Sequence, residues 1–264
     1  MKNVFLKKMA LTAVFAAAFT AAAVLLPGGD MLFGTAVGAA MTGRPTANSS
    51  DELTVHSSGD YEYTVNEDGV SVSIIRYKGK GGVVEIPSKL GGKKVTKIMG
   101  VLNKDDKSIV DGTFEECKGL TKVIIPDSVS EIGMGAFYGC EELKNVVIPE
   151  GVERIGNEAF ARCSGLESIK LPESVSVIGK CAFSSSGLKE IYIPGGVSEI
   201  GQYAFSTESL ISAYFNDNVT DMGDLTFCLC HNLKNVHISK RASEIGESMF
   251  GFCEELENID MIFR

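Results

Sequence analysis

The sequence of 264 residues contains no tryptophan and only three histidines, His56, His231 and His237. It also lacks the short motifs of common active sites, namely H-E-x-x-H of zinc peptidases, G-x-S-x-G of serine hydrolases and the glycine-rich phosphate loop. Its glycines recur at a regular interval, which indicates turns. We therefore expect no enzyme activity and no cofactor.

Positive charge is scarce as well, because 25 Lys and Arg stand against 34 Asp and Glu, for a net charge of −9. Without residues 1–40, which hold three lysines and Asp30, 22 Lys and Arg remain against 33 Asp and Glu, a net charge of −11. An acidic chain of this kind disfavours nucleic acids and anionic membrane surfaces as partners.

The first 40 residues have the layout of a secretory signal. Three lysines precede an apolar run over residues 9–26, and the small residues Val37 and Ala39 suit a signal peptidase. The pattern predicts a signal peptide over 1–40, with cleavage after residue 39 or 40, and a secreted or cell-surface protein. An uncleaved membrane anchor also fits, because eighteen apolar residues span about 27 Å as a helix. No cysteine lies near the run, which disfavours a lipoprotein anchor.

Between residue 41 and the repeats, the chain changes character twice. Residues 41–60 are small and polar, which predicts a flexible lead-in. The segments YEYTV and VSVSI then alternate around Asp68-Gly69, a turn signal, and predict an N-terminal β-hairpin cap over 61–82.

From residue 83 to 264 the chain repeats itself about seven times. After a first unit interrupted by a polar insertion at 101–112, the proline slots are spaced by 23, 23 and 22 residues. The consensus is L-x-x-[VI]-x-[IV]-P-x-x-V-x-x-I-G-x-x-A-F-x-x-C-x-x. The phenylalanine slot holds Phe114, Phe137, Phe160, Phe183, Phe205, Phe227 and Phe250, and the proline slot holds Pro87, Pro126, Pro149, Pro172 and Pro194, followed by Asn216 and Ser239.

A unit of about 23 residues cannot bury its apolar side chains alone, so the repeat predicts a solenoid in which each slot packs on its copy one strand spacing away, about 4.8 Å. The segment KNVVIP is short and β-branched, which predicts a strand with Val146 and Ile148 inward and Val147 outward. The segment GNEAFARC is expected to form a single helical or 3₁₀ turn.

The seven cysteines are explained by the same repeat. Five of them share one slot, and we expect them to be small buried apolar residues and not disulfides: Cys117, Cys140, Cys163, Cys230 and Cys253. Cys181 and Cys228 lie outside this slot, about two coils apart. The cluster Cys228-Cys230-His231 is too small for a usual zinc site, so no metal is expected.

The L-x-x-[VI]-x-I-P and I-G-x-x-A-F-x-x-C slots closely resemble the BspA-like leucine-rich repeats of bacterial surface proteins, over residues 61–264. The resemblance implies a right-handed, mostly β solenoid with one parallel sheet and short helical or 3₁₀ turns. It also implies export and a role in adhesion. The chain departs from the pattern at 183–188 and 205–210, which are one residue short and lack the cysteine, and at Met222.

Ligands of such solenoids usually bind on the sheet face. The outward residues, two positions before each proline slot, are Ile124, Val147, Lys170, Tyr192, Tyr214, His237 and Asp260. We predict a ligand site at Lys170, Tyr192, Tyr214 and His237, with three rings on successive strands, for an extracellular protein or glycan. We expect Ile124 and Val147 to pack under the insertion.

The same rings have a purely structural explanation, because aromatic residues suit any exposed strand. Two further hypotheses stay open. The chain could self-associate through its C-terminal coil, since the end of a solenoid leaves a strand edge unpaired. It could also be an exported enzyme of another type, in which residues of catalytic type would converge in a pocket and not lie along a ladder.

Overall fold

The computed structural model describes residues 24–25, 31–32, 54–102, 109–216, 219, 221–239 and 249–262. The chain forms two compact units, Met1–Thr54 and Val55–Arg264. In the first unit, β1 (Val24–Leu25) pairs antiparallel with β2 (Met31–Leu32). Apart from these four residues, the predicted signal peptide and the lead-in up to residue 53 lie outside the described residues. Within the described residues no helix is long and apolar enough to cross a membrane.

The second unit begins with an antiparallel cap of three strands, β3 (Val55–Ser58), β4 (Tyr61–Val65) and β5 (Ser71–Tyr77). The predicted hairpin is β4 and β5. Between them, the Oδ1 atom of Asp68 accepts hydrogen bonds from the backbone N–H groups of Val70 and Ser71, both at 2.9 Å. Gly69 follows Asp68 with a φ of 69°. Strand β3 lies inside the range predicted as a flexible lead-in, so that prediction was wrong for residues 55–58.

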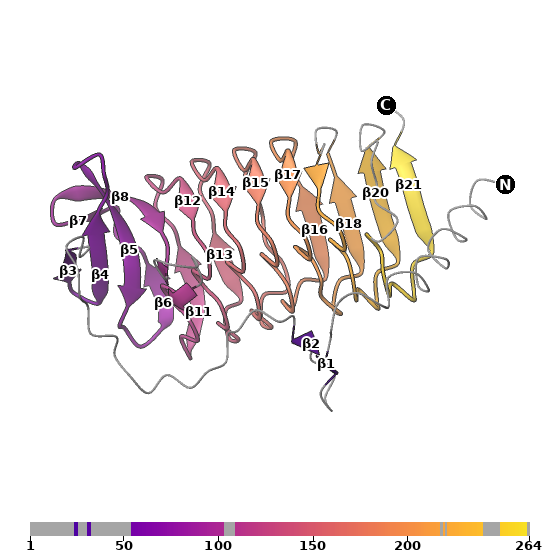
Figure 1. The fold of residues 1–264 in the computed structure, drawn as a ribbon, viewed down its shortest axis with the longest axis horizontal. Helices are drawn as coiled ribbons and strands as arrows, with labels where there is room; N and C mark the ends of the chain where they lie inside the picture. The colour runs from indigo at the N-terminus through magenta and orange to yellow at the C-terminus, as the bar shows by residue number, and fades with distance from the viewer. Residues whose placement is uncertain are drawn as a thin grey trace. The chain divides into compact units, whose positions relative to one another are not determined.

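The cap joins the solenoid through β5, which pairs parallel with β8 (Lys93–Ile98). From β8 a ladder of two-residue strands continues, one per coil, each containing the residue of the isoleucine-glycine slot (Figure 1). These strands are β12 (Glu131–Ile132), β14 (Arg154–Ile155), β15 (Val177–Ile178), β17 (Glu199–Ile200) and β19 (Asp221–Met222). The resemblance implied one parallel sheet, formed by the strands before the proline slot. The structure corrects this, because the two-residue strands form a second parallel ladder, called the second ladder below.

The predicted strands before the proline slot form two separate parallel sheets. In the first, β11 (Leu120–Ile124) lies between β6 (Gly82–Glu85) and β13 (Asn145–Val147). The second, here called sheet E, consists of β16 (Glu190–Ile193), β18 (Ser212–Phe215), β20 (Asn235–Ser239) and β21 (Asn258–Ile262). Residues 167–170 occupy the equivalent place in the coil between β13 and β16 but form no strand. The break coincides with the first repeat of 22 residues.

Two short pairings complete the first coil. Strand β7 (Lys89–Leu90) pairs antiparallel with β8, and β9 (Val101–Leu102) pairs antiparallel with β10 (Ile109–Asp111) across the predicted insertion. Residues 103–108 lie outside the described residues. Arg76 of β5 forms ion pairs with Glu62 and with Asp111, which ties the cap to β10.

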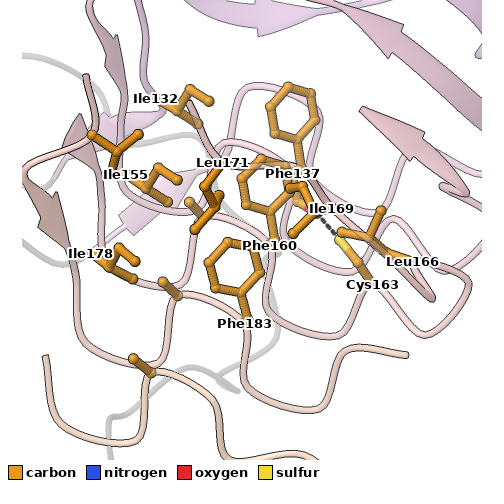
Figure 2. Close-up of a cluster of buried hydrophobic side chains, with 14 of the residues drawn as sticks. Ile132, Phe137, Ile155, Phe160, Cys163, Leu166, Ile169, Leu171, Ile178 and Phe183 are labelled. Atoms are coloured by element: carbon orange, nitrogen blue, oxygen red, sulfur yellow. Dashed lines mark hydrogen bonds between the residues drawn. The ribbon is translucent and has the colours of Figure 1, made fainter. Parts of the chain in front are cut away.

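The core is built as ladders of like residues, as the repeat predicted. The seven phenylalanine rings stack in sequence, with centroids 4.9 to 5.6 Å apart and planes within 19° of parallel. Tyr77 of the cap stacks on Phe114 at 4.7 Å and so begins the column. Figure 2 shows Phe137, Phe160 and Phe183 beside the isoleucines of the second ladder.

The segment between the isoleucine-glycine slot and the cysteine slot is a series of turns. Alternate N–H groups bond to the next coil, and the others bond within the coil. Glu158, Phe160 and Arg162 donate to Lys180, Ala182 and Ser184, whereas Ala159, Ala161 and Cys163 donate to Gly156, Glu158 and Phe160. Glu158 and Arg162 have φ values of 55° and 58°. These left-handed residues interrupt the 3₁₀-type bonds, so the described part of the chain contains turns where a helical turn was expected.

All seven cysteines are free, and five of them are buried. Cys117 and Cys253 are only half-buried, which corrects the expectation for these two. The structure also reveals a polar role that the sequence did not predict, because four thiols donate to a phenylalanine carbonyl of the preceding coil. These bonds join Cys140 to Phe114 (2.9 Å), Cys163 to Phe137 (3.1 Å), Cys230 to Phe205 (3.0 Å) and Cys253 to Phe227 (3.1 Å). Burial raises the pKa of Cys163 to about 12, which keeps the thiol protonated and able to donate.

We expect Cys163→Ala to lower the free energy of unfolding by about 1–2 kcal/mol, because it removes a buried sulfur and the hydrogen bond to Phe137. Urea denaturation under reducing conditions measures the change. Cys117→Ala is the matched control, since Cys117 occupies the same slot but is half-buried. Equal losses in the two variants would contradict a special role for the thiol–carbonyl bond.

The turn at Asp68 is expected to make stability depend on pH. The hydrogen bonds from the Ser71 hydroxyl and from the Ser71 and Val70 N–H groups lower the pKa of Asp68. A carboxylate with a lowered pKa contributes stability above its unfolded pKa, near 3.9, and loses it as the pH falls through the folded pKa. The urea midpoint of the wild type should therefore exceed that of Asp68→Asn at pH 6, and the difference should shrink towards pH 3. A constant difference would exclude this linkage.

Candidate functional site

The three predicted rings lie on neighbouring strands of sheet E in direct register. Tyr192 pairs with Tyr214, Tyr214 with His237, and His237 with Asp260. The rings point outward because their neighbours along each strand belong to the core. In β16, for example, Ile191 and Ile193 are buried while Tyr192 between them is exposed. The residues Tyr192, Tyr214 and His237 are called the ring ladder below.

The rings stack face to face along the sheet. The centroids of Tyr192 and Tyr214 are 4.6 Å apart with planes 6° from parallel, and those of Tyr214 and His237 are 4.7 Å apart with planes 4° from parallel. Beyond this stack, the Nδ1 atom of His237 lies 3.6 Å from Oδ2 of Asp260. Both faces of the Tyr214 ring are therefore covered by neighbours.

Exposure within the ladder is uneven. Tyr192 is 59% exposed, whereas Tyr214 is half-buried and the His237 side chain is 27% exposed. Aromatic rings attract C–H groups and cations on their faces, and present C–H groups at their edges. The ladder consequently ends at Tyr192 in a ring face that no further ring follows, since Lys170 occupies the equivalent place in the preceding coil. This side of Tyr192, away from Tyr214, is called the open face below. The rest of the ladder presents ring edges and the tyrosine hydroxyls.

Lys170, the fourth predicted site residue, is exposed but lies in the coil between the two sheets and not in a strand. One backbone hydrogen bond, from the N–H group of Lys189 to the carbonyl of Glu167 at 3.0 Å, joins this coil to the residue before β16. The side chains of Lys189 and Glu167 also form an ion pair at 2.8 Å. Lys170 is therefore adjacent to the ladder in the stacking order but outside its sheet.

A row of polar residues runs beside the ring ladder, two residues earlier on each strand and so on the same face of sheet E. Its members are Glu190, Ser212, Asn235 and Asn258, which are in register. Ser212 is buried, and the other three reach solvent. The Nδ2 atom of Asn258 donates to Oδ1 of Asn235 at 3.1 Å. From the sequence, Glu190 and Asn235 are predicted to form a mixed polar rim of the ladder together with Lys189 and Lys234. Ser212 and Asn258 were missed, although the period of two along each strand points to them.

The polar row affects the ring beside it. The pKa of Tyr192 is raised by desolvation, then by the negative charge of Glu190 and by the neighbouring Tyr214. The phenol therefore stays protonated at neutral pH and can donate a hydrogen bond from the edge of the ladder.

The first sheet has an apolar counterpart of the ladder. In the row that corresponds to the ring ladder, Ile124 pairs with Val147, which is 48% exposed, and with Glu85 of β6. Val83, 64% exposed, lies in the next row, where it pairs with Lys122. Strands β11 and β13 therefore carry aliphatic side chains where sheet E carries rings, and β6 carries a glutamate there. The predicted packing of Ile124 and Val147 under the insertion stays a prediction, because residues 103–108 of the insertion lie outside the described residues.

The cluster around Cys228 is occupied by other contacts. Cys228 and Cys230 are buried, and Cys230 donates to a backbone carbonyl. Nowhere in the described ranges do three His, Cys, Asp or Glu side chains come close enough to hold a metal ion.

Comparisons with known proteins match the repeat. The profile of the BspA type leucine rich repeat region matches in six copies, over residues 97–211 and 155–262. A crystal structure of a leucine-rich repeat protein from T. pallidum is similar, with 32% identity, a TM-score of 0.62, and coverage of 75% of this chain and 88% of that chain. A leucine-rich repeat protein from Bacteroides ovatus matches with 28% identity and a TM-score of 0.63 over 78% of this chain. The match covers 52% of that longer protein. No curated protein sequence matches significantly.

We expect the rings to stabilise one another measurably. Tyr214 contacts two rings and Tyr192 contacts one, so Tyr214→Ala should lower the free energy of unfolding by about 1–2 kcal/mol and Tyr192→Ala by about 0.5–1 kcal/mol. A double-mutant cycle measured by urea denaturation should give a coupling energy of about 0.5–1 kcal/mol. A coupling energy of zero would mean that the stacking contributes nothing to stability.

Proposed function

Because the chain belongs to the family of BspA-type leucine-rich repeat proteins, we propose that it is an exported binding module. It recognises a partner outside the cell with the outward face of sheet E. The predicted signal peptide provides the route of export. The partner is a protein or a glycan, and the chain acts by binding and not by catalysis.

The observation that carries this proposal is the ring ladder. Tyrosine and tryptophan are enriched at the energetic centres of interfaces, because their rings are large and lose little conformational freedom on binding. Here each ring is held by its neighbour at 4.6–4.7 Å. A partner therefore meets a surface that is already ordered, and less of the binding free energy is spent on ordering side chains.

The net charge of −9 supports the choice of partner. The accessible part of the polar row combines the carboxylate of Glu190 with the amides of Asn235 and Asn258, which can donate and accept hydrogen bonds. Such a surface suits a neutral or weakly basic partner. It does not suit the phosphate backbone of a nucleic acid or an anionic membrane surface.

The buried free thiols are compatible with export. Desolvation raises the pKa of Cys228 and of Cys181 to about 11, and thiols without thiolate character react slowly with oxidants. These cysteines can therefore remain reduced outside the cell because they are inaccessible and protonated.

The proposal predicts that the full chain binds a defined class of ligand on an array of glycans and host proteins. The double variant Tyr192→Ala/Tyr214→Ala should lose this binding at least about tenfold, the effect of removing interactions worth about 1.4 kcal/mol. Ile124→Ala/Val147→Ala is the matched control, because it changes the same row of the other sheet. Thermal unfolding of both variants establishes that they remain folded.

Equal binding by the wild type and the ring variant would place recognition elsewhere on the solenoid. An array without any bound ligand, together with concentration-dependent oligomers in light scattering, would replace the proposal with a structural, self-assembling role.

A further inference from the structure

The ring ladder has one open aromatic face, on Tyr192. Tyr214 covers the other face of that ring at a centroid distance of 4.6 Å, and Tyr214 is itself enclosed between Tyr192 and His237. On the opposite side of Tyr192 the described coil places no further ring. Tyr192 is also the most exposed member of the ladder, at 59%. At the other end of the ladder, Asp260 lies beside His237, with Oδ2 3.6 Å from Nδ1, so Tyr192 is the better position for a ligand that stacks on an aromatic face.

The coil on the open side of Tyr192 is the one that interrupts the sheet. Residues 167–170 form no strand, so β16 begins sheet E and its outward row starts at Tyr192. Lys170 occupies the next place in that row and is exposed. The open ring face is thus bordered by a long, positively charged side chain on the neighbouring coil.

A carboxylate borders the same ring. Glu190 lies two residues before Tyr192 on β16, is exposed, and points to the same side of the sheet. Glu167, in contrast, is paired with Lys189 at 2.8 Å. The surroundings of the open face are therefore an aromatic surface flanked by one ammonium and one carboxylate, which together can donate and accept hydrogen bonds around a stacked ligand.

The area of the outward face of sheet E limits the class of partner. Three spacings of about 4.8 Å between its four strands and a strand length of about 17 Å give an area of roughly 250 Å². A stable protein–protein interface buries about 800 Å² on each partner. A protein would have to extend well beyond sheet E, whereas a short oligosaccharide fits within it.

These observations fit the chemistry of a sugar ring. A pyranose has one face of C–H groups, which packs on the negative face of an aromatic ring, and a periphery of hydroxyls that need both donors and acceptors. Resting on the binding function proposed above, we propose that the open face of Tyr192 is a subsite for one pyranose ring of a neutral oligosaccharide. Lys170 and Glu190 bind its hydroxyls, and adjacent sugars extend along the polar row towards Asn235 and Asn258.

The test uses the full chain and four neutral tetrasaccharides, cellotetraose, chitotetraose, laminaritetraose and mannotetraose, measured by isothermal titration calorimetry. At least one should bind with a Kd below about 1 mM, typical of weak surface recognition. Because the chain has no tryptophan, quenching or enhancement of tyrosine fluorescence provides a second readout.

The variants separate stacking from other roles. Tyr192→Phe keeps the ring face and should bind within about threefold of the wild type, whereas Tyr192→Ala should lose at least about tenfold. Lys170→Met and Glu190→Gln should each weaken binding by about three- to tenfold, the effect of losing one hydrogen bond. Val147→Ala is the matched control, because Val147 is exposed in the corresponding row of the other sheet, and it should change binding by less than about twofold. His237→Ala, at the far end of the ladder, distinguishes stacking on the open face from contact along the ring edges.

Three outcomes overturn the proposal. If none of the four tetrasaccharides binds while a protein on the array does, the sugar subsite is wrong and the binding function stands. If His237→Ala weakens sugar binding as much as Tyr192→Ala, the ligand contacts the ring edges and not the open face. If neither sugars nor proteins bind, the proposed function fails as well.

Discussion

The structure depends on the registry between one coil and the next. From coil to coil, the described phenylalanines and leucines lie against their copies in the neighbouring coil, as do the isoleucines up to Ile200, which pairs with Met222. The backbone of each described coil bonds to the same neighbour. The phenylalanine column shows how closely the registry is kept, since its centroid distances vary only between 4.9 and 5.6 Å over seven rings. Because no coil can bury these residues alone, the cap at Tyr77 is needed to cover the first of them.

The registry also provides hydrogen-bond partners for the backbone C=O and N–H groups that the narrow core buries. At four coils the carbonyl group of the phenylalanine slot accepts a hydrogen bond from a thiol of the next coil. In the turns, alternate N–H groups bond between coils and within the coil, so neither set is left unpaired. The thiol is suited to this position because it is small, apolar enough to bury and still a weak donor.

Much of this arrangement could be predicted from the sequence. The phenylalanine and cysteine columns, the hairpin at Asp68-Gly69 and the row of Tyr192, Tyr214 and His237 follow from the period and from the alternation along a strand. The second ladder could not be predicted, because strands of two residues such as β14 are too short to show a period. The break at residues 167–170 depends on hydrogen bonding between coils of unequal length, and the orientation of the rings depends on side-chain torsions. The change to a repeat of 22 residues marks the place of the break in the sequence, but it does not show that the strand is lost there, and the ring orientation leaves no trace in the spacing of residues.

The interruption between β13 and β16 divides the outward face of the solenoid into two panels, the sheet of β6, β11 and β13 and sheet E. Since each panel has its own hydrogen-bonded ladder, a duplicated or deleted coil within one panel leaves the rows of the other in place. Sheet E can therefore gain or lose strands when whole repeats are duplicated or deleted, while the sheet of β6, β11 and β13 keeps its registry. The discontinuity concerns only the strands before the proline slot, because the ladder from β8 to β19 runs past it without a break.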